Sequence, residues 1–264
     1  MPGDTCEIVV KATRAPVARI ESLKTAVEGL QRPAWVPVVS SGDGPPACSK
    51  FSGIPFLQEG EAWPVCTNCG RPMQLFLQLD LAGIPLEMQA ATGFGILQLF
   101  YCVNRDPFCE VDCHAADAFS ASVMARIVQP NTTSHDHGVI LPELDGYFLA
   151  KRIIDWERVA DYPGLEDLER RGIEFDGDSI KTILAIMQEN KWPSPNPGDK
   201  LGGWPFWIQS PVYPECTTCG KEMHLVFQIA SENNLPYMFG DDGIGQLFQC
   251  DDHNGVLAFH RNCY

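Results

Sequence analysis

The sequence predicts an α+β fold that is rich in β-structure and contains two copies of one unit. The segment "CTNCGRPMQLFLQL", which begins at Cys66, returns as "CTTCGKEMHLVFQI", which begins at Cys216. Behind each cysteine pair, apolar and polar residues alternate, and alternation with a period of two is typical of a half-buried β-strand. Each copy is therefore expected to be a helix followed by an antiparallel sheet, with a cysteine knuckle at the head of the sheet.

The two copies match over much of the chain. Cys66 and Cys216 are 216 − 66 = 150 positions apart, and "KFSGIPF" at Lys50 and "KLGGWPF" at Lys200 differ by the same offset. Further on, "GILQLFYC" and "GIGQLFQC" end at positions 102 and 250, an offset of 250 − 102 = 148. Matches of this length with one small gap indicate an internal duplication of one unit rather than a solenoid of many repeats.

The duplication divides the chain into two units within one compact, pseudo-symmetric body. Residues 1–142 are assigned to the first unit, and residues 143–264 to an acidic connecting segment and the second unit. Between positions 143 and 178 there are eleven acidic and five basic residues, which leaves 11 − 5 = 6 net negative charges. A solvated face is the default interpretation of such a segment, and a docking surface for a basic partner is the sharper one.

Each element of the unit has its own signal. Strands are predicted over the alternating residues 73–81 and 223–229, and second strands over the stretches that end at Cys102 and Cys250. The "GDDG" at Gly240 predicts a turn, since glycine and aspartate are ordinary turn residues. Apolar residues at helical spacing predict a helix before each copy. They are Val17, Ile20, Leu23, Val27 and Leu30, with Pro33 blocking continuation, and Ile180, Ile183, Leu184 and Met187, with Asp178 or Ser179 as N-cap.

The eleven cysteines indicate metal binding. The opening residues, "MPGDTCEIVVKATRAP", contain no secretory signal pattern, so a cytoplasmic protein is expected. In a reducing compartment, metal ligation is a better expectation for cysteines than a disulfide framework. Cysteine pairs with a two-residue gap supply the soft ligands that tetrahedral zinc requires. We therefore predict two zinc ions per chain, one in each copy, so that each cysteine knuckle is a zinc knuckle.

The predicted zinc ligands follow the repeat. The first site is expected to be all-cysteine, and the second to combine cysteines with a histidine. The predicted ligands are Cys66, Cys69, Cys102 and Cys109 (or Cys113) in the first site, and Cys216, Cys219, Cys250 and His253 (or Cys263) in the second. Four protein ligands fill a tetrahedral site, whereas a catalytic zinc keeps one position open, so both sites are predicted to be structural. Cys6 and Cys48 have no counterpart in the repeat and are interpreted as ordinary thiols.

The common enzyme motifs do not occur in the sequence. There is no His-Glu-x-x-His, no Gly-x-Ser-x-Gly elbow, no P-loop and no dinucleotide fingerprint. Asp241 and Asp242 are interpreted as turn residues rather than catalytic acids. His135, Asp136 and His137 in "SHDHG" are interpreted as part of an exposed polar loop rather than a metal site. No catalytic residue is predicted, and the chain is expected not to be an enzyme.

The chain is strongly acidic. Its 34 acidic and 19 basic residues give a formal net charge of −15. This balance argues against direct binding of nucleic acid, which needs a basic surface, and it favours the attraction of a basic partner protein. The sequence contains no run of about 18 apolar residues, so no contact with a membrane is predicted.

Several longer stretches resemble a known family. "LGGWPFWIQ", "YPECTTCGKEMHLVFQI", "GDDGIGQLFQCDDH" and "LAFHRNCY" are similar to bacterial YwqG-like proteins, a family of unknown function, and the likeness extends from about Lys50 onward. The cysteine pair and the strands around it are more distantly similar to programmed cell death protein 2 and its yeast relatives. Those relatives are dedicated chaperones of a basic ribosomal protein, and YwqG-like domains occur among candidate immunity proteins paired with toxins. The resemblance implies protein binding and assigns no catalytic residue.

These observations lead to one functional prediction with two alternatives. The chain is expected to be a non-catalytic, zinc-stabilised protein that binds a basic partner, namely a cognate toxin such as a nuclease, which it neutralises as an immunity protein. The first alternative is a dedicated chaperone of a basic ribosomal-type protein. The second is an enzyme of unrecognised type that uses a cleft between the two copies, since ligand pockets occur preferentially at such interfaces.

Overall fold

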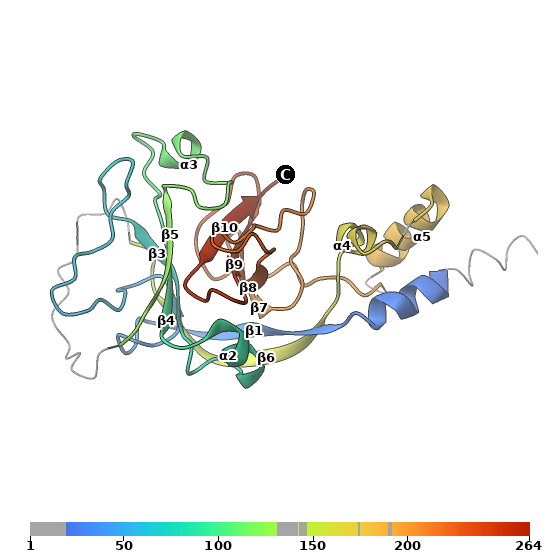
Figure 1. The fold of residues 1–264 in the computed structure, drawn as a ribbon, viewed down its shortest axis with the longest axis horizontal. Helices are drawn as coiled ribbons and strands as arrows, with labels where there is room; N and C mark the ends of the chain where they lie inside the picture. Colours follow the sequence, from blue (N-terminus) through green and yellow to red (C-terminus); the bar gives the residue numbers. More distant parts are fainter. Residues whose placement is uncertain (1–19, 131–141, 143–146, 174, 190–191) are drawn as a thin grey trace, which may run out of the picture.

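The computed structural model describes residues 20–130, 142, 147–173, 175–189 and 192–264 (Figure 1). Within these ranges, ten strands form a single antiparallel sheet, so the predicted β-rich fold is confirmed. The strands are β1 (Arg32–Ser41), β2 (Lys50–Phe51), β3 (Gln74–Asp80), β4 (Ile96–Tyr101), β5 (Val123–Val128), β6 (Lys151–Asp161), β7 (Lys200–Gly202), β8 (His224–Ala230), β9 (Ile244–Gln249) and β10 (Leu257–Asn262). The helices are α2 (Leu86–Thr92), α3 (Cys109–Asp112), α4 (Leu165–Arg170) and α5 (Gly177–Gln188), and residues 20–28 are also helical.

The two long strands β1 and β6 lie at the centre of the sheet. Its order is β10-β9-β8-β7-β1-β6-β2-β3-β4-β5. β1 pairs with β6 and with β7, and β6 pairs with β1 and with β2. β1 therefore lies beside β7, the short strand that follows β6 in the sequence. In the same way, β6 lies beside β2, the short strand that follows β1. A division between residues 142 and 143 would separate strands that hydrogen-bond to each other, and part of the segment interpreted as an acidic connection is the central strand β6.

The strands on either side of this central pair follow the same plan. We call residues 42–130, which contain β2 to β5, the first half, and residues 192–264, which contain β7 to β10, the second half. The four strands predicted from the sequence are β3 and β4 in the first half and β8 and β9 in the second. β3 and β8 each have one break in register at the same place, between Leu75 and Leu77 and between Leu225 and Phe227.

The sheet curls until its end strands meet. β5 and β10 lie against each other, so the sheet is nearly closed (Figure 1). The main core contains aromatic rings from both halves, and Phe76 stacks on Tyr101 with ring centroids 4.8 Å apart. Phe239 from the second half contacts both rings edge-on, at 5.9 and 6.0 Å. The two halves therefore share one core and stabilise each other.

The prediction that the strands are half-buried is wrong, because β3, β4, β8 and β9 are buried on both faces. Loops cover the face that carries the polar residues, and glutamine side chains bind the loop backbone. Gln78 Oε1 accepts the amide of Phe56 at 2.7 Å, and its counterpart Gln228 Oε1 accepts the amide of Phe206 at 2.9 Å. The Nε2 atom of each glutamine donates to two further loop carbonyls. These buried polar groups are satisfied, so the alternation does not mark a solvent-exposed face.

The helix at residues 20–28, α4 and α5 lie together at one end of the molecule, whereas α2 and α3 lie elsewhere around the sheet (Figure 1). The helix at residues 20–28 and α5 share an apolar cluster that contains Val27, Leu168 and Ile183, so they pack together rather than each covering its own copy. Val17, the first residue of the predicted helix, lies outside the described residues. None of the helices that the structure describes has both the length and the apolar character needed to cross a membrane.

The N-cap of α5 differs from the prediction. Asp176, rather than Asp178 or Ser179, caps the helix, because its Oδ1 atom accepts the amide of Ser179 at 2.7 Å. Asp178 lies inside the first turn, where its negative charge is favourable next to the N-terminal amides. Aspartate and serine are both common N-cap residues, so the residue type alone does not locate the cap, and the backbone geometry does.

Candidate metal centres

The same backbone turn carries the cysteine pair of each half. Gly70 N donates to Cys66 O at 2.8 Å, and Gly220 N donates to Cys216 O, also at 2.8 Å. The φ values of the two glycines are 70° and 71°, a conformation that glycine adopts without steric strain. The turn brings the sulfur atoms of each pair to within 4.8 Å of each other. The Cys-x-x-Cys-Gly pattern therefore produces one geometry twice.

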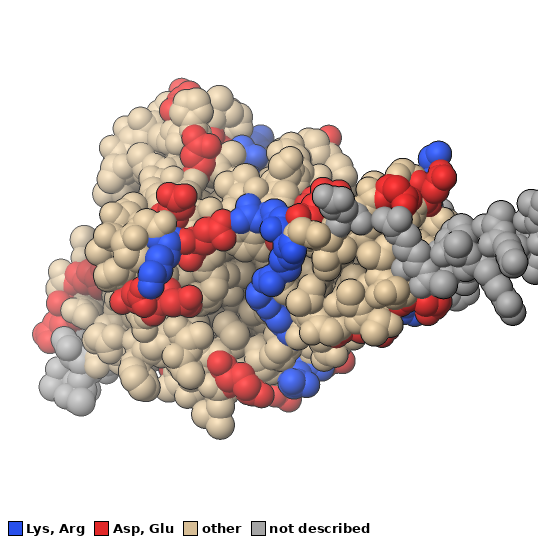
Figure 2. All heavy atoms as spheres, turned by 45° about the vertical axis from the view of Figure 1, so that its right-hand side comes forward, with Lys and Arg blue, Asp and Glu red and all other residues tan. Residues whose placement is uncertain are grey.

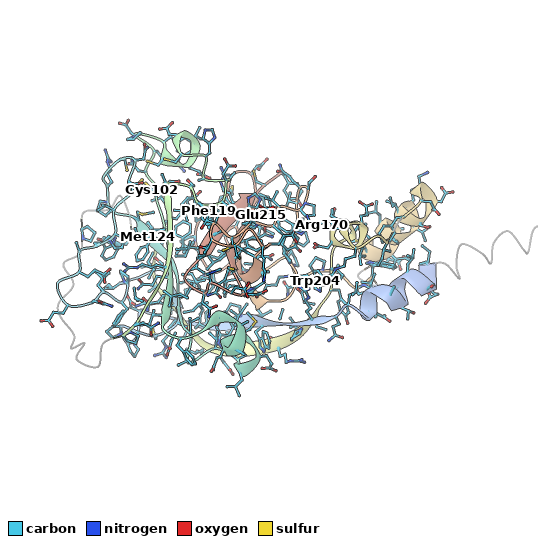
Figure 3. All side chains as sticks on the ribbon, in the orientation of Figure 1. Cys102, Phe119, Met124, Arg170, Trp204 and Glu215 are labelled. Atoms are coloured by element: carbon cyan, nitrogen blue, oxygen red, sulfur yellow. The ribbon has the colours of Figure 1, made fainter. Side chains whose placement is uncertain are left out.

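The first cysteine cluster consists of Cys66, Cys69, Cys102 and Cys109, whose Sγ atoms all lie within 4.8 Å of one another. Cys102 directly follows β4, and Cys109 begins α3. The Sγ atoms of Cys66 and Cys109 are 3.9 Å apart, and those of Cys69 and Cys102 are 3.7 Å apart. Three of the four cysteines are buried and Cys69 is half-buried. Figure 3 shows Cys102 beside β5, near Met124, which packs on the same apolar cluster.

The second cysteine cluster consists of Cys216, Cys219, Cys250 and His253, and its ligand atoms also lie within 4.8 Å of one another. The Sγ atoms of Cys219 and Cys250 are 3.6 Å apart. His253 Nδ1 lies 3.8 Å from Cys216 Sγ and 3.6 Å from Cys250 Sγ. Cys219 is exposed, and His253 is half-buried. This cluster is therefore more open to solvent than the first.

The two alternative ligands lie outside these clusters. Cys113 follows Cys109 by one helical turn, and its amide donates to Cys109 O at 3.1 Å. Cys263 lies beyond the end of β10 and is half-buried. Cys48 belongs to neither cluster, and Cys6 lies outside the described residues. All the cysteines that the structure describes are free thiols, so the close sulfur contacts are not disulfides.

The spacing within each cluster fits a tetrahedral metal ion. Four metal–sulfur bonds of about 2.3 Å require sulfur–sulfur distances of about 3.8 Å. The sulfur–sulfur contacts measure 3.6, 3.7 and 3.9 Å. With one metal–nitrogen bond of about 2.0 Å, the sulfur–nitrogen distance becomes about 3.5 Å, close to the contacts of His253 at 3.6 and 3.8 Å. Each cluster could therefore hold one ion with four protein ligands and no open coordination position.

The thiols of a cluster cannot all ionise side by side without a cation. Burial raises the pKa of Cys102, and it raises the pKa of Cys109 to about 11. Burial alone would also raise the pKa of Cys216, but the amides of Thr218 and Cys219 outweigh it and lower this pKa to about 6. A divalent cation between the sulfurs would hold them as thiolates. The chemistry of the donor set therefore agrees with the geometry.

Each half contains a buried lysine that pairs with an aspartate, and sequence reasoning missed both pairs. Lys200 Nζ lies 2.9 Å from Asp161 Oδ2, and both side chains are 0% exposed. Lys50 forms the corresponding pair with Asp43, whose side chain is 30% exposed. The two lysines occupy equivalent positions in the repeat, but their acids do not, because Asp43 precedes Lys50 by seven positions and Asp161 precedes Lys200 by 39. The repeat could have drawn attention to the lysines, but their partners are visible only in the structure.

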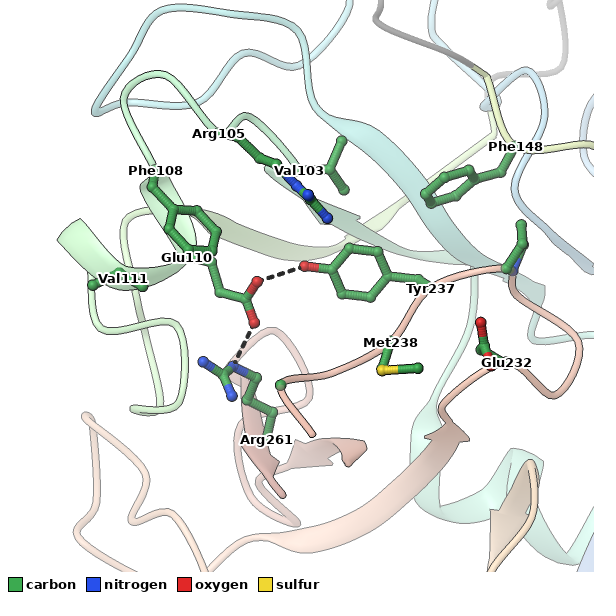
Figure 4. Close-up of a pocket in the computed structure, with 12 residues that line it drawn as sticks. Val103, Arg105, Phe108, Glu110, Val111, Phe148, Glu232, Tyr237, Met238 and Arg261 are labelled. Atoms are coloured by element: carbon green, nitrogen blue, oxygen red, sulfur yellow. Dashed lines mark hydrogen bonds and ion pairs between the residues drawn. The ribbon is translucent and has the colours of Figure 1, made fainter. Parts of the chain in front are cut away.

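A pocket of about 680 Å³ opens between the two halves (Figure 4). Its lining includes α3 and the loop before it on one side, and residues 232–240 on the other. Glu110 of α3 is buried and accepts the hydroxyl of Tyr237 at 2.8 Å. Arg261 Nε lies 3.1 Å from the other oxygen of Glu110. Because Glu110 follows Cys109, this bridge ties the first cysteine cluster to the second half.

The remaining residues discussed in the sequence analysis lie in exposed turns, inside the molecule or outside the described residues. Asp241 and Asp242 are exposed in a turn before β9, as predicted. His135, Asp136 and His137 lie outside the described residues. Asp161 and Asp167, which the sequence assigns to the acidic segment, are 0% and 3% exposed. These two acids bind lysine, tryptophan and tyrosine side chains inside the molecule, so they add nothing to an acidic surface.

One comparison with known proteins gives a match. A family model described as "Domain of unknown function (DUF1963)" matches residues 49–260, which include both cysteine clusters. A search of curated proteins finds no match. The resemblances to YwqG-like proteins and to programmed cell death protein 2 stay predictions.

Proposed function

The chain belongs to the DUF1963 family of domains of unknown function, and we propose that it is a non-catalytic, zinc-stabilised protein that binds a basic partner protein. The proposed partner is a cognate toxin, such as a nuclease, which the chain neutralises as an immunity protein. The observation that carries the proposal is the pair of four-ligand clusters, because a full ligand set stabilises a fold without offering a position for substrate.

The proposed metal is zinc, with two ions per chain. Cysteine-rich tetrahedral sets are the usual ligands of structural zinc, and the sulfur spacing supports this choice. Copper(I) and iron–sulfur clusters also use thiolates, but a three-cysteine, one-histidine set is a common structural zinc site. The matched knuckles, register breaks and glutamines in both halves further support an internal duplication.

Charge supports a basic partner. The chain has a formal charge of −15 without metal. Zinc would add −4 + 2 = −2 at an all-cysteine site and −3 + 2 = −1 at the mixed site, giving a total of about −18 once the thiols are deprotonated. Such a field accelerates the capture of a cationic protein and repels nucleic acid. A nuclease must present a positive face to its substrate, so an acidic protein could cover that face.

Parts of the acidic segment are available for this contact. Asp155 and Glu157 on β6, and Glu166 and Glu169 on α4, are exposed. Acidic groups also occur widely over the face in Figure 2. The exposed acids lie on separate elements, so the proposed contact is a broad acidic surface rather than one continuous segment.

A co-expression experiment tests the proposal. Cells that produce the protein encoded beside this chain's gene are grown with and without the chain, and restored growth is the expected result. The purified pair should also form a complex at low salt that dissociates as salt rises. The variant Asp155→Asn/Glu157→Gln/Glu169→Gln should bind more weakly, whereas the control Lys181→Gln, which removes an exposed cation, should not. No rescue together with no complex at low salt would reject the proposal.

Two alternatives have their own tests. A dedicated chaperone of a basic ribosomal-type protein uses the same electrostatics, and it would keep that protein soluble during refolding without protecting cells from a toxin. The pocket between the halves supports the second alternative, an enzyme of unrecognised type, because its 680 Å³ lie within the usual range for small-molecule sites. Glu110 is engaged by Tyr237 and Arg261, so a ligand there would have to exchange with those contacts.

A further inference from the structure

A second pocket, of about 300 Å³, contains three arginines of this otherwise acidic chain. Arg32 begins β1, Arg170 ends α4, and Arg171 directly follows it. Figure 2 shows that basic side chains gather in a band across one face of the molecule. Figure 3 places Arg170 and Trp204 on the side near α4, away from Cys102. The pocket is therefore separate from the first cysteine cluster and from the pocket between the halves.

Trp204 is a fixed platform for two of these arginines. The Cζ atom of Arg32 lies 3.6 Å from the centre of the indole ring, and that of Arg171 lies 4.8 Å from it. Trp204 is 3% exposed. Its amide donates to Asp161 Oδ2 at 2.6 Å, and its indole N–H donates to Leu30 O at 3.0 Å. Guanidinium groups stacked on a fixed ring are held in place before a ligand arrives, which reduces the entropy lost on binding.

The carboxylates that line this pocket have other partners. Asp167 accepts the indole N–H of Trp207 at 3.0 Å and the hydroxyl of Tyr213 at 2.6 Å. Asp251 lies 2.7 Å from His224 Nδ1, and Glu222 binds Arg170.

Among the residues that the structure describes, neither Arg32 nor Arg171 has a carboxylate within ion-pair distance. Burial lowers the pKa of Arg32, and repulsion from Arg171 lowers it further. Both arginines are solvent-exposed residues that can be reached by a ligand, and a bound anion would offset the repulsion between them.

We propose that this pocket binds a phosphate group, either as inorganic phosphate or as a small phosphate monoester. Guanidinium forks match phosphate oxygens in geometry, and a dianion balances the charges of Arg32 and Arg171 together. A carboxylate would balance only one of them. The small volume of the pocket suits a small ligand.

Among the residues that the structure describes, the first half lacks the tryptophan platform of this pocket. Ile54 occupies the position of Trp204 in the repeat, since 204 − 54 = 150, and it is 38% exposed. An isoleucine cannot stack with a guanidinium, so the platform is absent there. One phosphate site per chain is therefore expected, in contrast to two metal sites.

Calorimetric titration of the full-length, metal-loaded chain with inorganic phosphate tests the site. Saturable binding of one phosphate per chain is expected. Arg32→Gln and Arg171→Gln should each weaken binding about tenfold or more, because each removes charge-assisted hydrogen bonds. Arg158→Gln, which removes an exposed arginine of β6 outside the pocket, should leave the affinity within about twofold. Absence of saturable binding at millimolar phosphate, or equal binding by the Arg32 and Arg171 variants, would overturn the proposal.

A second measurement uses the unmodified chain and does not depend on how the variants fold. In NMR spectra of arginine side chains, phosphate should shift the Nε–Hε signals of Arg32 and Arg171 and leave that of Arg158 in place. Repeating the titration with glycerol phosphate distinguishes the two proposed ligands. If glycerol phosphate binds more tightly than inorganic phosphate, the ligand is a phosphate monoester, and if it binds more weakly, the ligand is the free ion. Acetate at the same concentration should produce smaller shifts, and equal shifts with acetate would contradict a phosphate site.

Discussion

The two cysteine clusters share three candidate ligands by position and differ in the fourth. In the first half the chain continues from Cys102 through a loop to Cys109 on α3, whereas in the second it turns back after Cys250 to His253. The knuckle turns are the same, with matching hydrogen bonds of 2.8 Å. The knuckle and the strand end therefore place three candidate ligands in each half, while the connection after the strand places the fourth and sets how exposed the cluster is.

The two halves also differ in what lies beneath their loops. Lys200 of the second half forms a fully buried pair with Asp161 at the end of β6, and Asp161 also accepts the amide of Trp204, whereas Asp43, the partner of Lys50 in the first half, is partly exposed. At another equivalent position, Asp199 in the second half replaces Ser49 in the first. At this position the second half therefore buries an acid where the first half has a serine.

The largest expected effect follows from removing one ligand of either cluster. Structural zinc contributes roughly 10–16 kcal/mol of apparent binding free energy in zinc-finger peptides, and whole domains are stable by about 5–15 kcal/mol. Cys69→Ser and Cys219→Ser are therefore each expected to lower Tm by about 10 °C or more, as measured by differential scanning calorimetry. The decrease should be larger for Cys69, because the first cluster also positions α3 and its bridge to Tyr237.

Matched controls come from the two alternative ligands. Cys113→Ser and Cys263→Ser remove thiols that lie outside the clusters, so each should shift Tm by only a few degrees. A decrease for Cys113→Ser as large as that for Cys69→Ser would show that Cys113 is a ligand of the first site.

The next effect concerns the buried ion pairs. Lys200→Met leaves Asp161 buried without its cation, and breaking such a pair typically destabilises a protein by about 3–5 kcal/mol. Lys50→Met should cost less, about 1–3 kcal/mol, because water can reach Asp43. Urea unfolding of the two variants measures both free energies. Equal losses would mean that the difference in burial has no energetic consequence.

A smaller effect depends on pH. Burial raises the pKa of Asp199 to about 6, although it accepts the amides of Ala230 and Asn234. Between about pH 4 and 6 the folded chain therefore keeps a proton on Asp199 that the unfolded chain has lost. The contribution of Asp199 to the free energy of unfolding is fully present below pH 4 and is lost as the pH rises through 6. The loss amounts to at most about 3 kcal/mol.

Asp199→Ser copies the first half and should remove this dependence. Relative to the unmodified chain, the variant should gain up to about 3 kcal/mol in free energy of unfolding between pH 4 and 7, as measured by urea titrations at each pH. The reciprocal change, Ser49→Asp, should introduce a similar dependence into the first half, where Ser49 Oγ accepts the amide of Asp80. Parallel stability profiles for the unmodified chain and Asp199→Ser would show that Asp199 does not titrate in this range.

Local patterns in the sequence could predict the strands and the residues that cluster as candidate ligands, because both depend on short-range spacing. Alternation locates β3 and β8, and the repeat brings Cys102 and Cys250 into the same role as strand ends. The central strand β6 could not be predicted in this way. Its exposed acids resemble a solvated segment, and its partner β1 lies more than a hundred positions earlier in the sequence.

Burial and long-range pairing explain the other differences between the structure expected from the sequence and the observed one. Gln78 looks like a solvent-facing residue in an alternating strand, but a loop more than twenty residues away supplies its hydrogen bonds. The pocket around Arg32 and Arg171 was missed for the same reason, since these two arginines meet only when β1 and the end of α4 pack around Trp204.

Metal content tests the central claim, that two equivalent knuckles each complete a four-ligand metal site. Native mass spectrometry of chain purified anaerobically without chelators should find two zinc ions per molecule. Cys219→Ser and Cys69→Ser should each retain one, and Cys113→Ser and Cys263→Ser should retain two. A chain that carries no metal, or that keeps two ions after loss of Cys219, would contradict the account.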